Sequence, residues 1–245
     1  MTRRRWIADE VNGDRAALVG EHAAHLARVL RAQVGQEFEV ATGEVVRPGK
    51  ITAISDERVE FALGAELSAK SLPRFTMLLA IFKFDRMEWA IEKCTETGVA
   101  EIIPVIAQRT DSYLAAAAVK RQERWRRIAR QAAEQSRRAM PPDIAAPRQL
   151  RDAMGRDGLK IVLAESEEGA TLAATLTKHR PEEGISLAIG PEGGWTGDEM
   201  GLFCGAAWIP VSLGQTILRA ETAAIAATAI AISTLAELRR VRSAE

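Results

Sequence analysis

Two different patterns of hydrophobic and polar positions divide the chain near residue 70. Residues 37–63 alternate β-favouring runs with Gly, Pro and Asp turns, which predicts a small barrel or meander. Residues 21–31, EHAAHLARVLR, have the spacing of a short amphipathic helix. The segment SAKSLPR, residues 68–74, is predicted to be a linker. We therefore predict a first domain over residues 1–72.

From Phe75 onward, short apolar runs alternate with longer amphipathic ones. Strands are predicted at residues 75–83, 101–106, 160–166, 185–190 and 208–214. Helices are predicted at residues 85–98, with Gly98 as C-cap, at 120–135, from Thr196 onward and at 221–240. This alternation predicts an α/β domain over residues 73–245, with a mostly parallel sheet covered by helices on both faces.

Two strand-to-helix junctions carry unusual residues. The first, ISLAIGPEGGWTGDE, ends in Thr196 and Glu199, which are spaced as a capping box at a helix start. The second, WIPVSLGQTILRAET, places Arg219 and Glu221 at the start of the last helix. Ligands bind open α/β sheets at the carboxyl ends of strands, so these junctions and the strand end at Glu165 are expected to converge on one pocket. From the residues alone, such glycines more often form a plain tight turn than a ligand-binding loop.

Composition and charge describe an ordinary soluble protein with an uneven basic distribution. Of the 245 residues, 47% are apolar and 27% are charged. Because 33 basic side chains balance 33 acidic ones, the net charge provides no overall attraction for a polyanion such as RNA. Basic residues nevertheless gather between positions 120 and 138, as Lys120, Arg121, Arg124, Arg126, Arg127, Arg130, Arg137 and Arg138. Such a stripe is either a solvated face or a nucleic-acid surface.

Several familiar sites are excluded by spacing. GEVVRPGK has five residues between its glycines and Ile51 after its lysine, so it is not a phosphate-binding P-loop. No dinucleotide fingerprint, nucleophile elbow or zinc motif is present, and the three histidines are too scattered for a metal site. We therefore predict no metal.

The expected compartment follows from the cysteines and the apolar segments. Cys94 and Cys204 are expected to be core thiols in a reducing compartment. MTRRRW is not followed by an apolar run, and the Ala-rich segment from Ala223 to Ala236 is too weakly apolar to span a bilayer. A cytoplasmic protein without a membrane segment is predicted.

Longer strings identify a family. IGPEGGWTGDE followed by VSLGQTILRAETAAIAA resembles the RsmE-type 16S ribosomal RNA uridine-N3 methyltransferases of the SPOUT superfamily. The resemblance extends through KFDRMEWAIEKCTETGVAEIIPV, ERWRRIARQAAEQSRRAMPPDI and HAAHLARVLRAQVGQEFEV, and so covers nearly the whole chain. Two positions depart from the family pattern: Thr216 replaces a frequent basic residue, and Thr97 replaces a usual leucine.

The resemblance implies a PUA-like N-terminal β-barrel that helps to bind RNA, and a C-terminal domain with a deep trefoil knot. It also implies S-adenosylmethionine as methyl donor, a homodimer with active sites near its interface, and 16S ribosomal RNA of the small ribosomal subunit as partner. The cofactor-binding residues carried over from the family are Leu163, Ala164, Glu165, Gly190, Pro191, Glu192, Gly193, Gly194, Leu213, Gly214, Ile217, Leu218, Arg219, Thr222 and Ala223.

Chemistry and RNA binding are assigned to charged residues. Arg219 is expected to stabilise the uracil anion that forms during attack, and Glu221 to orient Arg219 or the base, or to accept the proton. The expected RNA-binding residues are Arg3, Arg4, Arg5, Arg28, Arg31, Arg124, Arg127, Arg137 and Arg138. Three alternatives stay open: a SPOUT methyltransferase acting on transfer RNA or a ribose 2′-hydroxyl, a catalytically inactive RNA-binding paralogue, and a small-molecule enzyme.

Overall fold

The computed structural model describes residues 5–43, 45–67 and 74–242. These residues group into two compact units, one within Met1–Ser71 and Arg130–Pro141, the other within Leu72–Ala129 and Pro142–Glu245. Arg3, Arg4 and the predicted linker, except for its last residue, lie outside the described residues.

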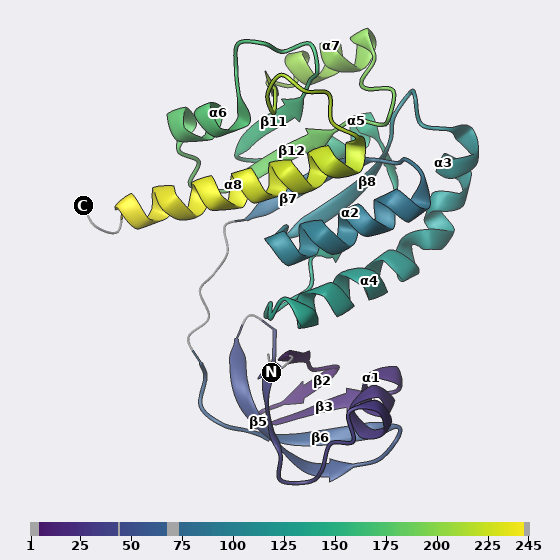
Figure 1. Ribbon diagram of the computed structural model, residues 1–245, viewed down its shortest axis with the longest axis vertical. Coiled ribbons are helices and arrows are strands. Elements are labelled where there is room, and N and C mark those ends of the chain that lie inside the picture. Colours follow the sequence, from purple (N-terminus) through teal and green to yellow (C-terminus); the bar gives the residue numbers. More distant parts are fainter. Residues whose placement is uncertain (1–4, 44, 68–73, 243–245) are drawn as a thin grey trace. The chain divides into compact units, whose positions relative to one another are not determined.

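The second unit is built on a parallel sheet (Figure 1). Among the described residues its strand order is β10-β8-β7-β12-β11-β13, with β9 beside β8, and every pairing is parallel. The strands are β7 (Phe75–Ala80), β8 (Glu101–Ile106), β9 (Asp143–Ile144), β10 (Arg148–Gln149), β11 (Leu159–Leu163), β12 (Ile185–Ile189) and β13 (Ile209–Val211). The predicted α/β fold with a parallel sheet is confirmed.

Helices cover both faces of this sheet, because successive side chains of a strand point to opposite sides. Met77 faces a core shared with helices α2, α4, α6 and α8, whereas its neighbour Leu78 packs with residues of α5 and α7. The helical elements are α2 (Phe84–Thr97), α3 (Ser112–Ala118), η2 (Val119–Arg121), α4 (Gln122–Gln135), α5 (Leu150–Ala153), α6 (Leu172–His179), α7 (Gly197–Gly205) and α8 (Ala220–Arg242).

The pair α2 and α8 forms a well-packed wall of the larger core. Cys94 of α2 is fully buried, and the Thr228 hydroxyl of α8 lies 3.4 Å from its sulfur. Burial raises the pKa of the Cys94 thiol to about 12. Gly98 ends α2 with φ of 117°, so its predicted C-cap role is confirmed. The prediction of a second core thiol is wrong, because Cys204 lies exposed on α7.

Contrary to the expectation for residues 223–236, helix α8 is long and apolar enough, by length and composition alone, to cross a membrane. The candidate segment Ala220–Val241 has a mean hydropathy of 1.3, and 33% of it is buried. Its buried positions include Ala224, Ala227 and Ala231, which belong to the core cluster of the second unit. In this structure α8 is therefore a core helix of the α/β unit.

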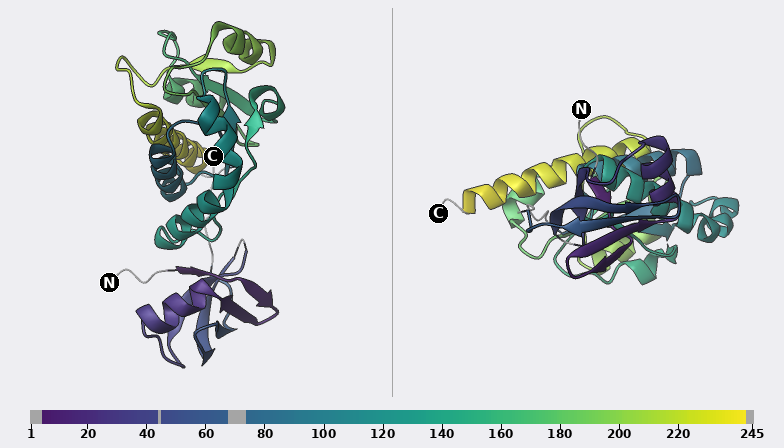
Figure 2. Two further views of the ribbon diagram at one scale, coloured as in Figure 1. Left: turned by 90° about the vertical axis from the view of Figure 1, so that its right-hand side faces the viewer. Right: turned by 90° about the horizontal axis from the view of Figure 1, so that it is seen from below.

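The first unit is a curled six-stranded sheet, seen from two further sides in Figure 2. Its order among the described residues is β1-β4-β5-β6-β3-β2, and only Ala8 and Asp9 separate β1 from β2 along the chain. Strands at opposite edges of the order are thus joined by two residues, so the sheet must curl until its edges meet. The elements are β1 (Arg5–Ile7), β2 (Glu10–Asn12), β3 (Arg15–Val19), α1 (Glu21–Ala24), η1 (His25–Val29), β4 (Glu37–Ala41), β5 (Val46–Ile54) and β6 (Arg58–Leu63).

The core of this first unit is small but closed. Trp6, Leu18 and Phe61 are almost completely buried in it, and the predicted helix at residues 21–31 packs through Leu26. That helix is shorter than predicted, because it passes from α1 into a π-helical turn, η1, and ends before Arg31, whose φ is 50°. The end of α4 groups with this unit, and Ala133 packs with residues of β1, β4 and β5.

Candidate active site

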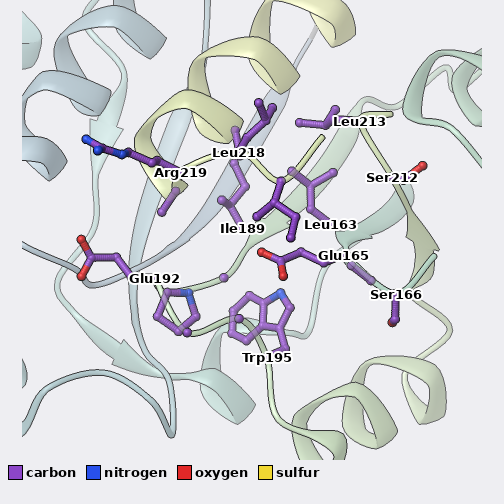
Figure 3. Close-up of a pocket in the computed structure, with 18 of the residues that line it drawn as sticks. Leu163, Glu165, Ser166, Ile189, Glu192, Trp195, Ser212, Leu213, Leu218 and Arg219 are labelled. Carbon is purple, nitrogen blue, oxygen red and sulfur yellow. The ribbon is translucent and has the colours of Figure 1, made fainter. Parts of the chain in front are cut away.

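A cavity of about 610 Å³ lies where three adjacent strands end. The ends of β11, β12 and β13 lie side by side, because β11 pairs with both of the others. Each strand is followed by a loop that lines the cavity, and Figure 3 shows Leu163, Ile189 and Leu218 pointing into one space from these loops and strands. This is the carboxyl edge of the sheet, where ligands of open α/β folds bind.

The loop after β12 is shaped by its glycines. Gly194 has φ of 70°, and its amide closes a turn by donating to the Pro191 carbonyl at 2.8 Å. A Cβ on Gly193 would lie 3.2 Å from Cδ of Arg109, and one on Gly190 would lie 3.3 Å from the Trp195 indole nitrogen. The bare backbone therefore fits where side chains would crowd the loop.

The far end of this loop is anchored at the start of α7. The Thr196 side chain accepts from the Glu199 amide, while the Glu199 carboxylate accepts from the Thr196 amide at 2.9 Å. The predicted capping box is confirmed. The other carboxylate oxygen of Glu199, a residue only 2% exposed, accepts from the Gln108 amide at 2.8 Å, so the box also holds the loop after β8.

The loop after β13 is more open. Gly214 has φ of 126°, a conformation that side chains disfavour. Ile217 lines the cavity but is 81% exposed, and Arg219 is exposed at the start of α8. Among the described residues the Arg219 guanidinium has no hydrogen-bond or ion-pair partner.

Three arginines and two carboxylates line the cavity, and one of the arginines also contacts a third carboxylate, Glu221, which does not line it. Arg86, from the first turn of α2, donates to Glu192 at 2.8 Å and lies 3.8 Å from Glu221. Arg109 donates to the Gly193 carbonyl. Figure 3 shows Arg219 and Glu192 on one side of the cavity, with the Glu165 carboxylate beside Trp195.

Most of the residues expected at the cofactor site line this cavity. They are Leu163, Ala164, Glu165, Gly190, Pro191, Glu192, Gly193, Gly194, Leu213, Gly214, Ile217, Leu218, Arg219 and Ala223. One residue of that set, Thr222, does not line it and is exposed. Glu221, which was expected to be catalytic, does not line it either and is buried. Sequence reasoning missed Arg86 and Arg109, although both follow strand ends at the same edge of the sheet, where the strand-end rule could have found them.

The residues expected to bind RNA belong to both units. In the first unit, Arg5 pairs with Glu39 at 2.9 Å and donates to the Arg137 carbonyl, while Arg28 pairs with Asp56 at 2.6 Å. Arg31 and Arg137 are exposed and have positive φ. Burial lowers the pKa of Arg138 to about 10.

In the second unit the basic stripe of α4 is partly neutralised. Arg124 pairs with Glu88 at 2.7 Å, and Arg121 lies 3.5 Å from the same carboxylate. Arg127 is exposed and has no ion-pair partner among the described residues. The apolar side chains of α4 pack inward, with Trp125 and Ala129 fully buried.

The comparisons with known proteins agree with this geometry. A family model for the RNA methyltransferase domain matches residues 70–232. Ribosomal RNA small subunit methyltransferase E of Synechocystis sp. is 34% identical over 211 residues, which span 84% of this chain and 68% of that protein. The protein of the same name from Bacillus subtilis is 32% identical over 236 residues, 91% of each chain.

A solved structure extends the likeness to the fold. The crystal structure of ribosomal RNA small subunit methyltransferase E from Neisseria gonorrhoeae, bound to S-adenosyl methionine, superposes with a TM-score of 0.80. It is 27% identical and covers 93% of this chain and 95% of its own. The fold and the strand-end cavity therefore define an RNA methyltransferase domain. Within that class, the chain belongs to the ribosomal RNA small subunit methyltransferase E family.

Proposed function

We propose that the protein transfers a methyl group from S-adenosylmethionine to N3 of a uridine in 16S ribosomal RNA of the small ribosomal subunit. The observation that carries the proposal is the cavity at three adjacent strand ends, walled by glycine backbone and apolar side chains, with the exposed Arg219 among its lining residues. The family to which the chain belongs, and the cofactor in the Neisseria gonorrhoeae structure, support it.

The residues present fit S-adenosylmethionine. The cavity has the size of a small-molecule site. Its glycine loop leaves backbone groups uncovered at positions where a Cβ would meet Arg109 or Trp195. Leu163, Ile189 and Leu218 supply apolar walls suited to an adenine ring (Figure 3). When bound, the cofactor supplies an electrophilic methyl group on a sulfonium sulfur.

In this reaction the protein must stabilise the anion that forms at N3 of the uracil ring. Uracil N3 loses its proton, its lone pair forms the new N–C bond, and the carbon–sulfur bond breaks with its electron pair left on sulfur. Arg219 is an exposed cation at the cavity, without an ion-pair partner among the described residues, and stabilises the negative charge as it spreads over the uracil oxygens. Glu221 is buried and does not line the cavity, which favours an orienting role over proton acceptance.

Finer features of the family belong to the same proposal. They are a PUA-like barrel over residues 1–72 that helps to bind RNA, a methyltransferase domain over residues 73–245 with a deep trefoil knot, a homodimer and a cytoplasmic location. The curled sheet whose edges meet supports the barrel. The non-sequential order β7-β12-β11-β13 is compatible with a chain that threads through itself.

The RNA surface is tested by salt dependence. Arg127 is exposed without an ion-pair partner among the described residues, whereas Arg124 is engaged by Glu88. We expect Arg127→Ala to reduce the salt slope of RNA binding by about 1, and Arg124→Ala to reduce it less. Binding that does not change between low and moderate salt would count against a phosphate-contacting surface.

The function itself is tested by nucleoside mass spectrometry of 16S ribosomal RNA from cells with and without the protein. N3-methyluridine should be present only with it. A new 2′-O-methyl nucleoside, or a modification confined to transfer RNA, would favour another SPOUT methyltransferase. Calorimetry with S-adenosylmethionine separates an enzyme from an inactive RNA-binding paralogue, which would not bind the cofactor.

A further inference from the structure

Arg86 connects two segments that no sequence motif joins. It lies in the first turn of α2, and its guanidinium contacts one carboxylate from the glycine loop and one from the start of α8. The contact with Glu192 is a hydrogen-bonded ion pair of 2.8 Å. The contact with Glu221 is a longer ion pair of 3.8 Å through Nε. One side chain thus links both loops that wall the cavity.

The need for a cation is greatest at Glu221. Its side chain is 5% exposed, and its second carboxylate oxygen is buried without a hydrogen-bond partner in the described residues. A buried carboxylate is costly unless it is paired, and removing its partner leaves the charge uncompensated. Within the described part of the chain, the cation that forms an ion pair with Glu221 is Arg86.

The position of Arg86 is set by the core. Its neighbour Met87 is fully buried, as are Ala90 and Ile91 further along α2. The same helix packs against α8, where the Thr228 hydroxyl meets the Cys94 sulfur. Arg86 therefore projects from a fixed support, in contrast to Arg219, which is exposed and lies in the open segment before α8.

We propose that Arg86 is a positioning residue of the methyl-transfer site. Through Glu192 it fixes the glycine loop against the cofactor, and through Glu221 it fixes the first turn of α8, directly after Arg219. This inference rests on the proposed function, because it gives both carboxylates a role in one reaction. It assigns Arg86 no contact with the reacting atoms.

The test is a double-variant cycle on the full chain with Arg86→Met, Glu192→Gln and their combination. Calorimetry gives the dissociation constant of S-adenosylmethionine, and methylation of unmodified small ribosomal subunits gives kcat. We expect each single variant to weaken cofactor binding roughly fivefold, and the double variant to be no more than about twofold weaker than either. We expect Arg86→Met to lower kcat about tenfold in both backgrounds, because the Glu221 contact is lost in both.

Lys93→Met is the matched control. Lys93 is a cation on the same helix, and it pairs at 2.8 Å with Glu92 and Glu96 of that helix. Its loss should change neither cofactor affinity nor kcat by more than about twofold. If Arg86→Met does not fold, Arg86→Lys, which keeps the charge but not the two-sided geometry, replaces it in the cycle and should show coupling of the same sign but smaller size.

The outcomes separate this inference from the proposed function. Losses of affinity that simply add in the double variant, or an Arg86 variant with wild-type kcat, would overturn the positioning role. A wild-type protein that binds S-adenosylmethionine but methylates no ribosomal RNA would defeat the proposed function. In that case the calorimetric cycle alone would still decide the link between Arg86 and Glu192.

Discussion

The loops after β12 and β13 wall the same cavity but are held in opposite ways. The glycine loop is tied by its own turn, by Arg109 and Arg86, and by the capping box at Thr196. For residues 213–218 the structure gives no hydrogen bond within the described part of the chain, and Ile217 is 81% exposed. We infer a division of labour in which the preformed loop holds the cofactor on one side, while the open loop adds apolar wall and presents Arg219 to a large substrate.

The largest effect should come from the open loop. Arg219→Ala should lower kcat roughly 100-fold, because it removes the charge that stabilises the developing uracil anion. Cofactor affinity should change by no more than about twofold, since the glycine loop is untouched. Single-turnover methylation and calorimetry measure the two quantities.

Arg240→Ala is the control for that variant. It removes an exposed arginine, paired with Glu237, from the other end of α8. Arg240→Ala should change neither kcat nor the affinity for S-adenosylmethionine. An Arg219→Ala protein with a nearly wild-type rate and unaltered cofactor affinity would end the division of labour between the two loops.

An intermediate effect is expected in the fixed loop. Gly194→Ala places a side chain at φ of 70°, which costs about 1 kcal/mol and cannot be relieved easily in a tethered turn. Cofactor affinity should fall roughly fivefold by calorimetry. Gly201→Ala is the control, because Gly201 lies within α7 and an added Cβ there would meet open space. This variant should bind S-adenosylmethionine with wild-type affinity. Equal affinities for the two variants would argue against a rigid cradle.

The smallest effect concerns the anchor of the fixed loop. Thr196→Ala removes the N-cap of α7 and should lower the free energy of unfolding by about 1 kcal/mol. Cofactor affinity should weaken by less than about threefold, because Arg86 and Arg109 still hold the loop. Thermal melts with and without S-adenosylmethionine measure both effects.

Thr171→Ala is the matched control, because the Thr171 side chain also caps a helix, accepting from the Ala174 amide at the start of α6. It should cost similar stability without changing the shift in melting temperature that the cofactor produces. If the cofactor-induced shift in melting temperature fell equally in both variants, the cap at Thr196 would act only on overall stability.

The order of strands and helices in the second unit was predictable because buried parallel strands and amphipathic helices have distinct periods. Gly98 and the pair Thr196 and Glu199 even marked helix ends correctly. Helices α3, α5 and α6 were missed. All three are short, and the Ala-rich α3 buries only Ala118, so it carries no clear apolar stripe.

The candidate site was predictable where backbone conformation dominates and less so where side chains from distant segments meet. The glycine loop can be recognised in the sequence, because few residues other than glycine adopt φ of 70°, the value at Gly194. The contact of Arg86 with Glu192 joins positions 106 residues apart, and no local pattern encodes it. Cys204 was placed in the core because thiols are usually buried, but α7 presents it to solvent.

The central claim is that the strand-end cavity supports N3-methylation of uridine in 16S ribosomal RNA, with Arg219 as the anion-stabilising group. The most direct measurement is nucleoside mass spectrometry of unmethylated small ribosomal subunits incubated with S-adenosylmethionine and either wild-type protein or Arg219→Ala. The account predicts N3-methyluridine with wild-type protein and little with the variant in the same time. Absence of N3-methyluridine with a wild-type protein that binds the cofactor would contradict it.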